Sequence, residues 1–153
     1  MERQKCDYFQ SGGYIYIANE WININVSYMF DSPRWHIYTR DANFLNLGFH
    51  KEEDDYWGLY LPYGDNYDYS AYRKCCFCNY KGCKCQCLGL TKDRIVTLDP
   101  SIEYQTMSGD HAWHGYDPHL DVKESELDDI WEERKPIEGF KFDVEPIVYL
   151  KKD

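Results

Sequence analysis

Hydrophobic and polar residues alternate over much of residues 14–39, with the period of two that is typical of a β-strand with one buried face. Residues 14–17 read Tyr-Ile-Tyr-Ile, and residues 22–30 alternate apolar and polar side chains except at Met29. Turn-forming residues separate these runs from each other and from a third run at residues 35–39. The pattern predicts an antiparallel β-meander over residues 14–39.

Three later runs also have the pattern of strands. Residues 56–61 end at Pro62, and residues 94–98 end at an Asp-Pro pair. Apolar side chains fall on one face over residues 140–150, where Pro146 removes one backbone donor and indicates an edge strand or a bulge.

One segment has the period of a helix. Leu127, Ile130 and Trp131 are spaced i, i+3 and i+4, which gives one apolar stripe, and Pro136 follows it. We therefore predict a helix over residues 122–135. Its remaining sides carry six carboxylates that predict an exposed anionic, partner-binding surface: Glu124, Glu126, Asp128, Asp129, Glu132 and Glu133.

Together these elements predict an α+β fold, with a mostly antiparallel sheet, one acidic helix in the C-terminal half and a cysteine-rich zinc-binding loop. The length of 153 residues favours a single domain over residues 1–153. In this prediction the zinc loop at residues 73–94 is an insertion between the β-rich N-terminal part and the C-terminal part.

The net charge of −10 is distributed unevenly. Residues 1–72 carry five Lys and Arg against eleven Asp and Glu, and residues 99–145 carry four against fourteen. Residues 73–94 carry six against one, so the basic stretch coincides with the cysteines. The two acidic arms disfavour nucleic-acid binding by the chain as a whole.

The sequence contains no apolar run near the roughly 20 residues that a membrane span needs. Its polar start lacks the apolar core of a signal peptide. We therefore expect a soluble protein without a membrane partner, in the cytoplasm or in the host cytoplasm if the protein is viral. Thiols stay reduced there, which disfavours disulfides.

Residues 75–87 contain six of the seven cysteines, a density that indicates a structural zinc site. One tetrahedral ligand set is Cys75, Cys78, Cys83 and Cys87, and Gly82 gives the backbone freedom to fold back. Two further thiols can substitute for members of this set, or join them in a two-metal cluster: Cys76 and Cys85.

This cysteine stretch resembles the zinc knuckle of retroviral nucleocapsid-type proteins, C-x2-C-x4-H-x4-C. Phe77 lies within the first cysteine pair and Gly82 precedes the third ligand, as in that family. Cysteine stands where the family has histidine, and the last gap is one residue shorter. The resemblance implies a metal-binding loop more strongly than it implies the knuckle's single-stranded nucleic-acid ligand.

A second chemical stretch contains three histidines and two aspartates that could bind a catalytic metal or act as general bases: Asp110, His111, His114, Asp117 and His119. It suggests a metal-dependent hydrolase as an alternative function. The spacing matches no catalytic signature such as H-E-x-x-H, so the balance is against an enzyme.

Tyrosines in a loop rich in aspartate suggest a contact surface, because tyrosine is enriched at interfaces: Tyr63, Tyr67 and Tyr69. With the acidic residues, they favour an interaction protein that binds a basic, nucleic-acid-handling protein as an inhibitor or adaptor. By analogy of charge and size, virus-encoded inhibitors of host defence have such surfaces. A second alternative is single-stranded nucleic-acid binding by the basic cysteine lobe.

Overall fold

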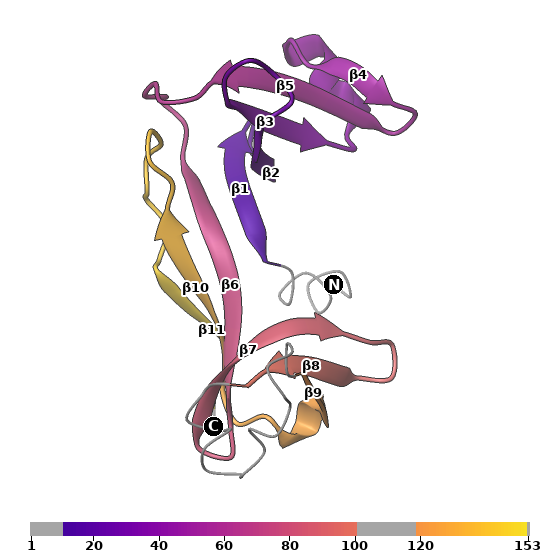
Figure 1. Ribbon diagram of the computed structural model, residues 1–153, viewed down its shortest axis with the longest axis vertical. Helices are drawn as coiled ribbons and strands as arrows, with labels where there is room; N and C mark the ends of the chain where they lie inside the picture. The colour runs from indigo at the N-terminus through magenta and orange to yellow at the C-terminus, as the bar shows by residue number, and fades with distance from the viewer. Residues whose placement is uncertain (1–10, 101–118, 153) are drawn as a thin grey trace. The chain divides into compact units, whose positions relative to one another are not determined.

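The structure is a computed structural model that describes residues 11–100 and 119–152, and these residues form almost entirely antiparallel β-structure (Figure 1). Within this part of the chain the helical elements are two short 3-10 turns, η1 (Ala42–Leu47) and η3 (Glu124–Glu126). The predicted α+β class is therefore wrong, since these residues contain no helix of seven residues or more. The backbone divides into two compact units, described separately below, and the single domain stays a prediction.

The first unit comprises Gly12–Arg73 and Lys135–Val144 and is called the meander unit here. Its strands run antiparallel in the spatial order β4-β5-β3-β2-β1. Their bounds are β1 (Gly12–Ile17), β2 (Glu20–Ser27), β3 (Arg34–Thr39), β4 (His50–Glu53) and β5 (Tyr56–Pro62). The predicted meander over residues 14–39 and the predicted strand over 56–61 are confirmed.

The hydrophobic core of the meander unit follows from a tight turn and strand alternation. Ala18 and Asn19 both have positive φ angles, 53° and 67°, which is the backbone of a two-residue hairpin turn. This turn places Ile15 directly opposite Ile22. Alternate side chains of the strands therefore enter one apolar cluster, and Phe44 and Phe49, which follow β3, complete it. The cluster includes Ile15, Ile22, Ile24, Trp35, Ile37, Phe44 and Phe49.

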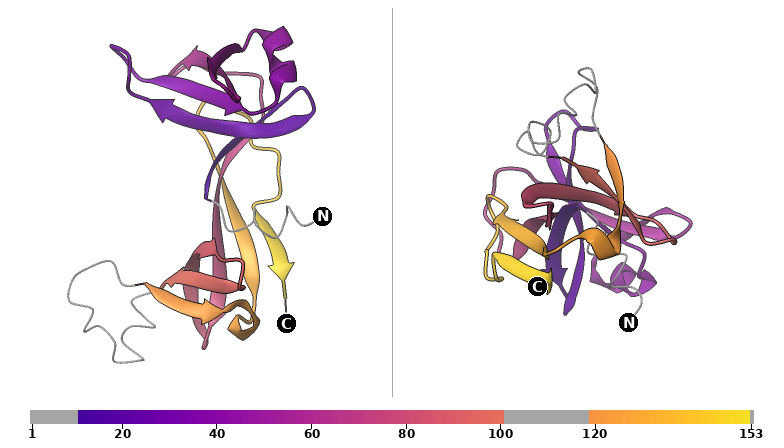
Figure 2. Two further views of the ribbon diagram at one scale, coloured as in Figure 1. Left: turned by 90° about the vertical axis from the view of Figure 1, so that its right-hand side faces the viewer. Right: turned by 90° about the horizontal axis from the view of Figure 1, so that it is seen from below.

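The second unit, called the cysteine unit here, comprises Ser11 and residues 74–100, 119–134 and 145–152 of the described chain. Its strands are β6 (Ala71–Tyr80), β7 (Cys83–Leu90), β8 (Ile95–Asp99), β9 (Leu120–Lys123), β10 (Ile130–Pro136) and β11 (Ile147–Lys151). The first residues of β6 and the last of β10 belong to the meander unit. Strands β6 to β9 follow one another in the sheet, and β10 pairs with both β6 and β11 (Figures 1 and 2).

The cysteine-rich segment is a β-hairpin, so the predicted zinc loop over residues 73–94 is wrong as an element. Strands β6 and β7 pair antiparallel, with Tyr80 opposite Cys83. The two turn residues, Lys81 and Gly82, have φ angles of 51° and 81°. A left-handed turn of this kind matches the twist of the strands and favours glycine.

The predicted helix over residues 122–135 is also wrong. This segment forms the end of β9, the η3 turn and β10, while Leu127 and Ile130 are buried in the unit's core. In a helix, Glu124 and Asp128 would be like charges four residues apart, as would Asp128 and Glu132, which destabilises a helix. The second half of this segment is strand β10, whose backbone pairs with β6 on one side and with β11 on the other.

The final part of the chain is only partly as expected. Strand β8 confirms the run predicted at residues 94–98. The strand predicted over residues 140–150 is shorter, because β11 begins at Ile147, directly after Pro146.

We predict that Ile15→Ala lowers the free energy of unfolding by about 2–5 kcal/mol, because the deleted side chain leaves a cavity in the core. Ile15 is fully buried, whereas Met29 is 83% exposed. Urea denaturation followed by tryptophan fluorescence measures the change. Met29→Ala is the control and should shift the value by no more than about 0.5 kcal/mol. Equal losses in both variants would contradict this account of the core.

Candidate functional site

The outer face of the meander unit presents a row of polar and aromatic side chains. In the strand register, Asn25 is opposite His36, and His36 is opposite Tyr60. Because side chains alternate along each strand, these residues and Tyr38 share the face that is turned away from the isoleucine core. Asn25, His36, Tyr38 and Tyr60 are called the aromatic face here.

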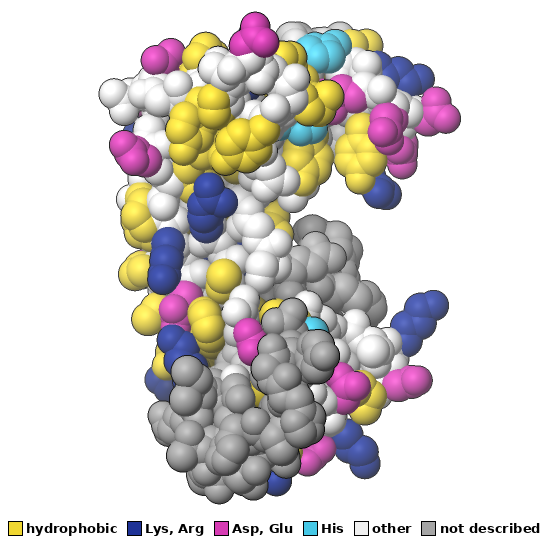
Figure 3. All heavy atoms as spheres, viewed as in Figure 1, with side chains coloured by type: hydrophobic (Ala, Val, Ile, Leu, Met, Phe, Trp, Pro, Cys, Tyr) yellow, Lys and Arg dark blue, Asp and Glu magenta, His cyan; other side chains and the backbone are white. Residues whose placement is uncertain are grey.

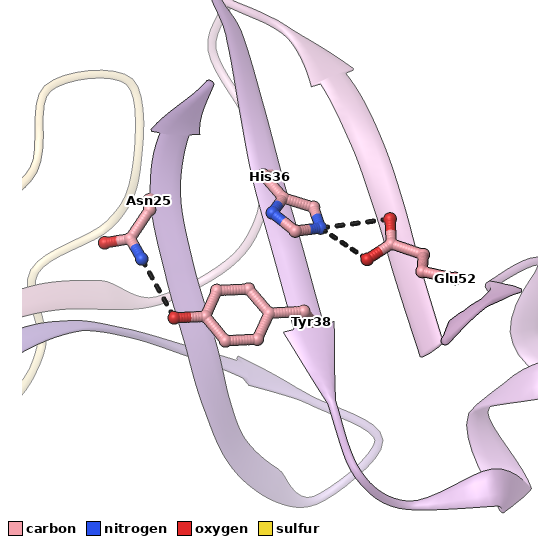
Figure 4. A network of polar contacts seen from close by, with 4 residues as sticks. All are labelled: Asn25, His36, Tyr38 and Glu52. Atoms are coloured by element: carbon pink, nitrogen blue, oxygen red, sulfur yellow. Dashed lines mark hydrogen bonds and ion pairs between the residues drawn. The ribbon is translucent and has the colours of Figure 1, made fainter. Parts of the chain in front are cut away.

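His36 is the centre of this face. Its ring stacks on Tyr38 and on Tyr60, with centroid distances of 4.9 Å and 4.6 Å and interplanar angles of 26° and 11°. Its Nε2 donates to the two carboxylate oxygens of Glu52 at 2.8 Å and 3.0 Å, a tautomer assigned from this acceptor (Figure 4). Two stacked rings and the hydrogen bonds to Glu52 therefore hold the imidazole in one orientation.

Glycine at position 58 gives Glu52 the space to reach His36. A Cβ atom built on Gly58 would lie 2.2 Å from the Glu52 Oε2 atom. Gly58 lies opposite Tyr38 in the sheet and is buried under the carboxylate. Because Gly58 of β5 has no side chain, the Glu52 side chain of β4 can lie over the sheet at this position.

The two tyrosines of the face remain protonated well above neutral pH. Burial, followed by the nearby Tyr56 phenol, raises the pKa of Tyr38, against the opposing effect of the Asn25 amide, which donates to its hydroxyl at 2.9 Å (Figure 4). Burial, followed by the charge and hydrogen bond of Glu52, raises the pKa of Tyr60. Both residues therefore present neutral rings with hydroxyl groups.

A shallow pocket lies at the edge of this face. It has a volume of about 280 Å³, and its lining combines two tyrosines, a histidine and two carboxylates: His36, Tyr38, Glu52, Glu53 and Tyr56. Acidic side chains lie close to hydrophobic and histidine side chains at the upper right of the space-filling view (Figure 3). Rings and carboxylates around one hollow suit an organic cation.

The chain itself places guanidinium groups on rings of this unit. The Arg40 guanidinium lies 4.9 Å from the centroid of Tyr56, and its Nη2 donates to the Tyr56 hydroxyl at 2.9 Å. The Arg34 guanidinium lies 4.2 Å from the centroid of Phe30. Aromatic rings here therefore accept arginine in a stacked arrangement, which indicates what an external cation would find.

The tyrosines that the sequence singled out belong to the same unit but have other contacts. Tyr67 donates its hydroxyl to the Pro62 carbonyl at 2.6 Å and stacks on Phe140. Tyr63 packs against the buried Trp35, although half of it is exposed. The structure therefore uses Tyr63 and Tyr67 partly to cover the core, and Tyr69 is partly exposed.

The six predicted acidic residues do not form one anionic surface. Glu124 pairs with Arg94, and Asp129 accepts from Asn79. Glu132 is buried, and Glu133 pairs with Lys84 at 2.8 Å. Glu126 and Asp128 are exposed. Several of these carboxylates therefore neutralise cations of their own unit, including lysines of the basic stretch.

Strand alternation divides the six cysteines of this stretch between the two faces of the hairpin. Cys76, Cys78, Cys83, Cys85 and Cys87 are buried in the core of the cysteine unit, whereas Cys75 is on the opposite face of β6 and partly exposed. The predicted set of Cys75, Cys78, Cys83 and Cys87 is therefore not brought together. Among the described residues, no group of three or more His, Cys, Asp or Glu side chains is arranged to hold a metal ion.

The sequence contained a signal for the observed arrangement. Cysteines at every second position on both sides of a Lys-Gly pair are the pattern of a hairpin with one thiol-lined face. Of the histidine stretch, Asp110, His111, His114 and Asp117 lie outside the described residues, and His119 is exposed just before β9.

Comparison with known proteins gives no relative. The chain matches no protein-family model, and neither the curated proteins nor the solved structures give a significant match. Within the residues that the structure describes, no helix has the length and apolar character that crossing a bilayer requires.

We predict that Glu52→Gln lowers the pKa of Tyr60 towards its ordinary value of 10.0, because the substitution removes a nearby negative charge. A titration of the Tyr60 ring carbon by NMR measures this shift. Glu53→Gln removes a neighbouring, exposed charge and should leave the Tyr60 pKa unchanged. Equal shifts in the two variants would contradict a specific contact with Glu52.

The raised pKa of Tyr60 also fixes the sign of a pH effect. The folded chain holds this proton more tightly than the unfolded chain, so the contribution of Tyr60 to stability is complete below pH 10.0. It declines as the pH rises through the folded pKa. In Glu52→Gln the decline should be smaller and should end at a lower pH, because the folded pKa then lies closer to the unfolded value.

Glu132→Ala should lower the free energy of unfolding by about 3–5 kcal/mol, because it leaves a buried cation without its carboxylate. Glu132 pairs with Lys74 at 3.7 Å and with Arg134 at 2.9 Å, and the side chains of Lys74 and Glu132 are both under 10% exposed. Asp128→Ala, at an exposed position, is the matched control. Thermal and urea unfolding measure both, and a loss below about 1 kcal/mol in Glu132→Ala would show that the pair is solvated.

Proposed function

We propose that this protein is a small acidic interaction protein, an inhibitor or adaptor, that binds a basic protein partner through the aromatic face of its meander unit. The observation that carries this proposal is the pocket in which two tyrosine rings and His36 lie beside Glu52 and Glu53. A lysine or arginine side chain satisfies both halves of such a pocket, because its charge pairs with carboxylates and attracts the ring faces.

Charge supports a basic protein segment as the partner. The meander unit carries six Lys and Arg against eleven Asp and Glu, a net charge of −5. A surface of this sign repels nucleic-acid phosphate and attracts a cationic chain. Arg40 on Tyr56 and Arg34 on Phe30 are internal examples of the same contact. We further propose that the protein acts in the cytoplasm, where its thiols stay reduced.

The energies of single cation–π contacts and ion pairs indicate how many contacts the partner must make. An exposed cation–π contact contributes about 0.5–1 kcal/mol, and an exposed ion pair contributes about 0.2–1 kcal/mol. A single seated arginine therefore cannot offset the several kcal/mol that association costs. Binding requires several basic residues along the partner, together with apolar burial on the exposed rings beside them.

The probe for this proposal is a synthetic arginine-rich peptide, titrated into the labelled full chain and followed by NMR. Shifts should concentrate on His36, Tyr38 and Tyr56. Binding should weaken strongly when salt rises from about 50 mM to about 500 mM, because the Debye length then falls well below 10 Å. An acidic peptide and single-stranded RNA and DNA are the comparison ligands.

Glu53→Gln should weaken peptide binding by up to about five-fold, which corresponds to about 1 kcal/mol. Asp31→Asn removes one charge from the same unit, in the turn before β3 and outside the pocket, and should change the affinity much less. Affinity that does not depend on salt, or equal losses in both variants, would sink the proposal. Tighter binding of RNA or DNA than of the peptide would favour nucleic-acid binding instead.

A further inference from the structure

The inner face of the β6–β7 hairpin is lined with thiols. Cys76 is directly opposite Cys87, and Cys78 is directly opposite Cys85. Cys83 lies one step further along the same face, opposite Tyr80. All five cysteines are at most 2% exposed, so thiols occupy five of the six inward positions between residues 76 and 87, and Tyr80 occupies the sixth. These five residues are called the thiol ladder here.

Packing alone does not explain this choice of residue. The rest of the unit contributes aliphatic side chains to the same cluster: Val96, Leu98, Val122, Leu127 and Ile130. Each buried methylene contributes about 0.8 kcal/mol, so a core built for stability favours valine or leucine over the shorter cysteine. Five departures from the aliphatic choice on one face of a hairpin indicate that sulfur chemistry, rather than volume, determines these positions.

The spacing of the thiol ladder suits a single tetrahedral ion. Zinc–sulfur bonds of about 2.3 Å place the four sulfurs of a tetrahedral site roughly 3.8 Å apart. Opposite residues of an antiparallel pair have Cβ atoms about 4.5–5.5 Å apart, so their sulfurs can approach to that distance. Alternate residues of one strand lie about 6.7 Å apart, so Cys76, Cys78, Cys85 and Cys87 form a rectangle of thiols. Side-chain rotation must draw their sulfurs inward to surround one ion.

The thiols do not converge on one point as they stand, since no group of described side chains is arranged to hold a metal ion. No disulfide engages Cys76, Cys78, Cys85 or Cys87. An ion would therefore displace thiol protons and draw the sulfurs inward. Metal affinity drives such a rearrangement in small thiolate sites.

A compensating charge is present on the same strand face. Lys74 is two residues before Cys76 on β6, and it is 6% exposed. Its ammonium lies 3.7 Å from the Glu132 carboxylate. The Glu132 carboxylate also pairs with Arg134, so these three side chains carry a net charge of +1. Four thiolates around a divalent ion carry a net charge of −2, and this positive charge reduces the cost of burying it.

We propose that Cys76, Cys78, Cys85 and Cys87 bind one tetrahedral, thiophilic metal ion of the zinc class on the inner face of the β6–β7 hairpin. Cys83 is a spare thiol beside the site, and Cys75 takes no part. This ligand set differs from one built on a C-x2-C knuckle, because each strand supplies two alternate residues. The site is independent of the aromatic face, and its failure leaves the proposed function untouched.

The test uses the full chain, produced with zinc in the medium and purified under reducing conditions without chelator. Elemental analysis should find about one zinc per chain. Replacement by Co²⁺ should give the sulfur-to-cobalt charge-transfer band and the visible bands of a tetrahedral thiolate site. X-ray absorption at the zinc edge should show four sulfur neighbours at about 2.3 Å, a reading that needs no variant.

The variants separate this ligand set from the alternatives. Cys85→Ser and Cys87→Ser should lose the metal, whereas Cys75→Ser should keep it, with the same cobalt spectrum as the unchanged chain. If the serine variants fail to fold, the sulfur count from X-ray absorption decides the matter. The proposal would be overturned if the purified chain contained no metal while all its cysteines were reduced. Disulfides between the opposite cysteine pairs would also overturn it. Loss of metal in Cys75→Ser would overturn the ligand set.

Discussion

The structure depends on the pairing of backbone N–H and C=O groups between antiparallel strands. Once two strands pair, their side chains must point alternately to opposite faces, so each strand has one set of residues for the core and one for solvent. A slip of one position would exchange the two sets. In the meander unit it would bury His36 and expose Ile37. In the cysteine unit it would turn Cys76 outward and Cys75 inward.

This constraint explains which parts of the fold can be predicted from the sequence. The meander is predictable because Ile22, Ile24 and Val26 alternate strictly with polar residues, and because turn residues follow. The acidic segment is not, because Leu127, Ile130 and Trp131 have a spacing compatible with a helix. Pairing on two sides of β10 decides the outcome there, and such tertiary pairing leaves no local signal.

The candidate sites show the same division. With a turn at Lys81-Gly82, alternation alone places five of the cysteines on one face of a hairpin, so this arrangement can be predicted from the sequence. The aromatic face was beyond prediction, because it depends on how β3, β4 and β5 register against one another. His36 meets Glu52 and Tyr60 only after those three strands pair. No short motif in the sequence links these residues.

The contact between Gly58 and Glu52 ties together two positions that no local rule connects. The carboxylate fills the volume that a side chain at position 58 would occupy. Any larger residue at position 58 would expel the acid and release the imidazole that it holds. In related sequences, the two positions should therefore change together: glycine with glutamate, or a side chain at position 58 with a residue at 52 that turns away from the sheet.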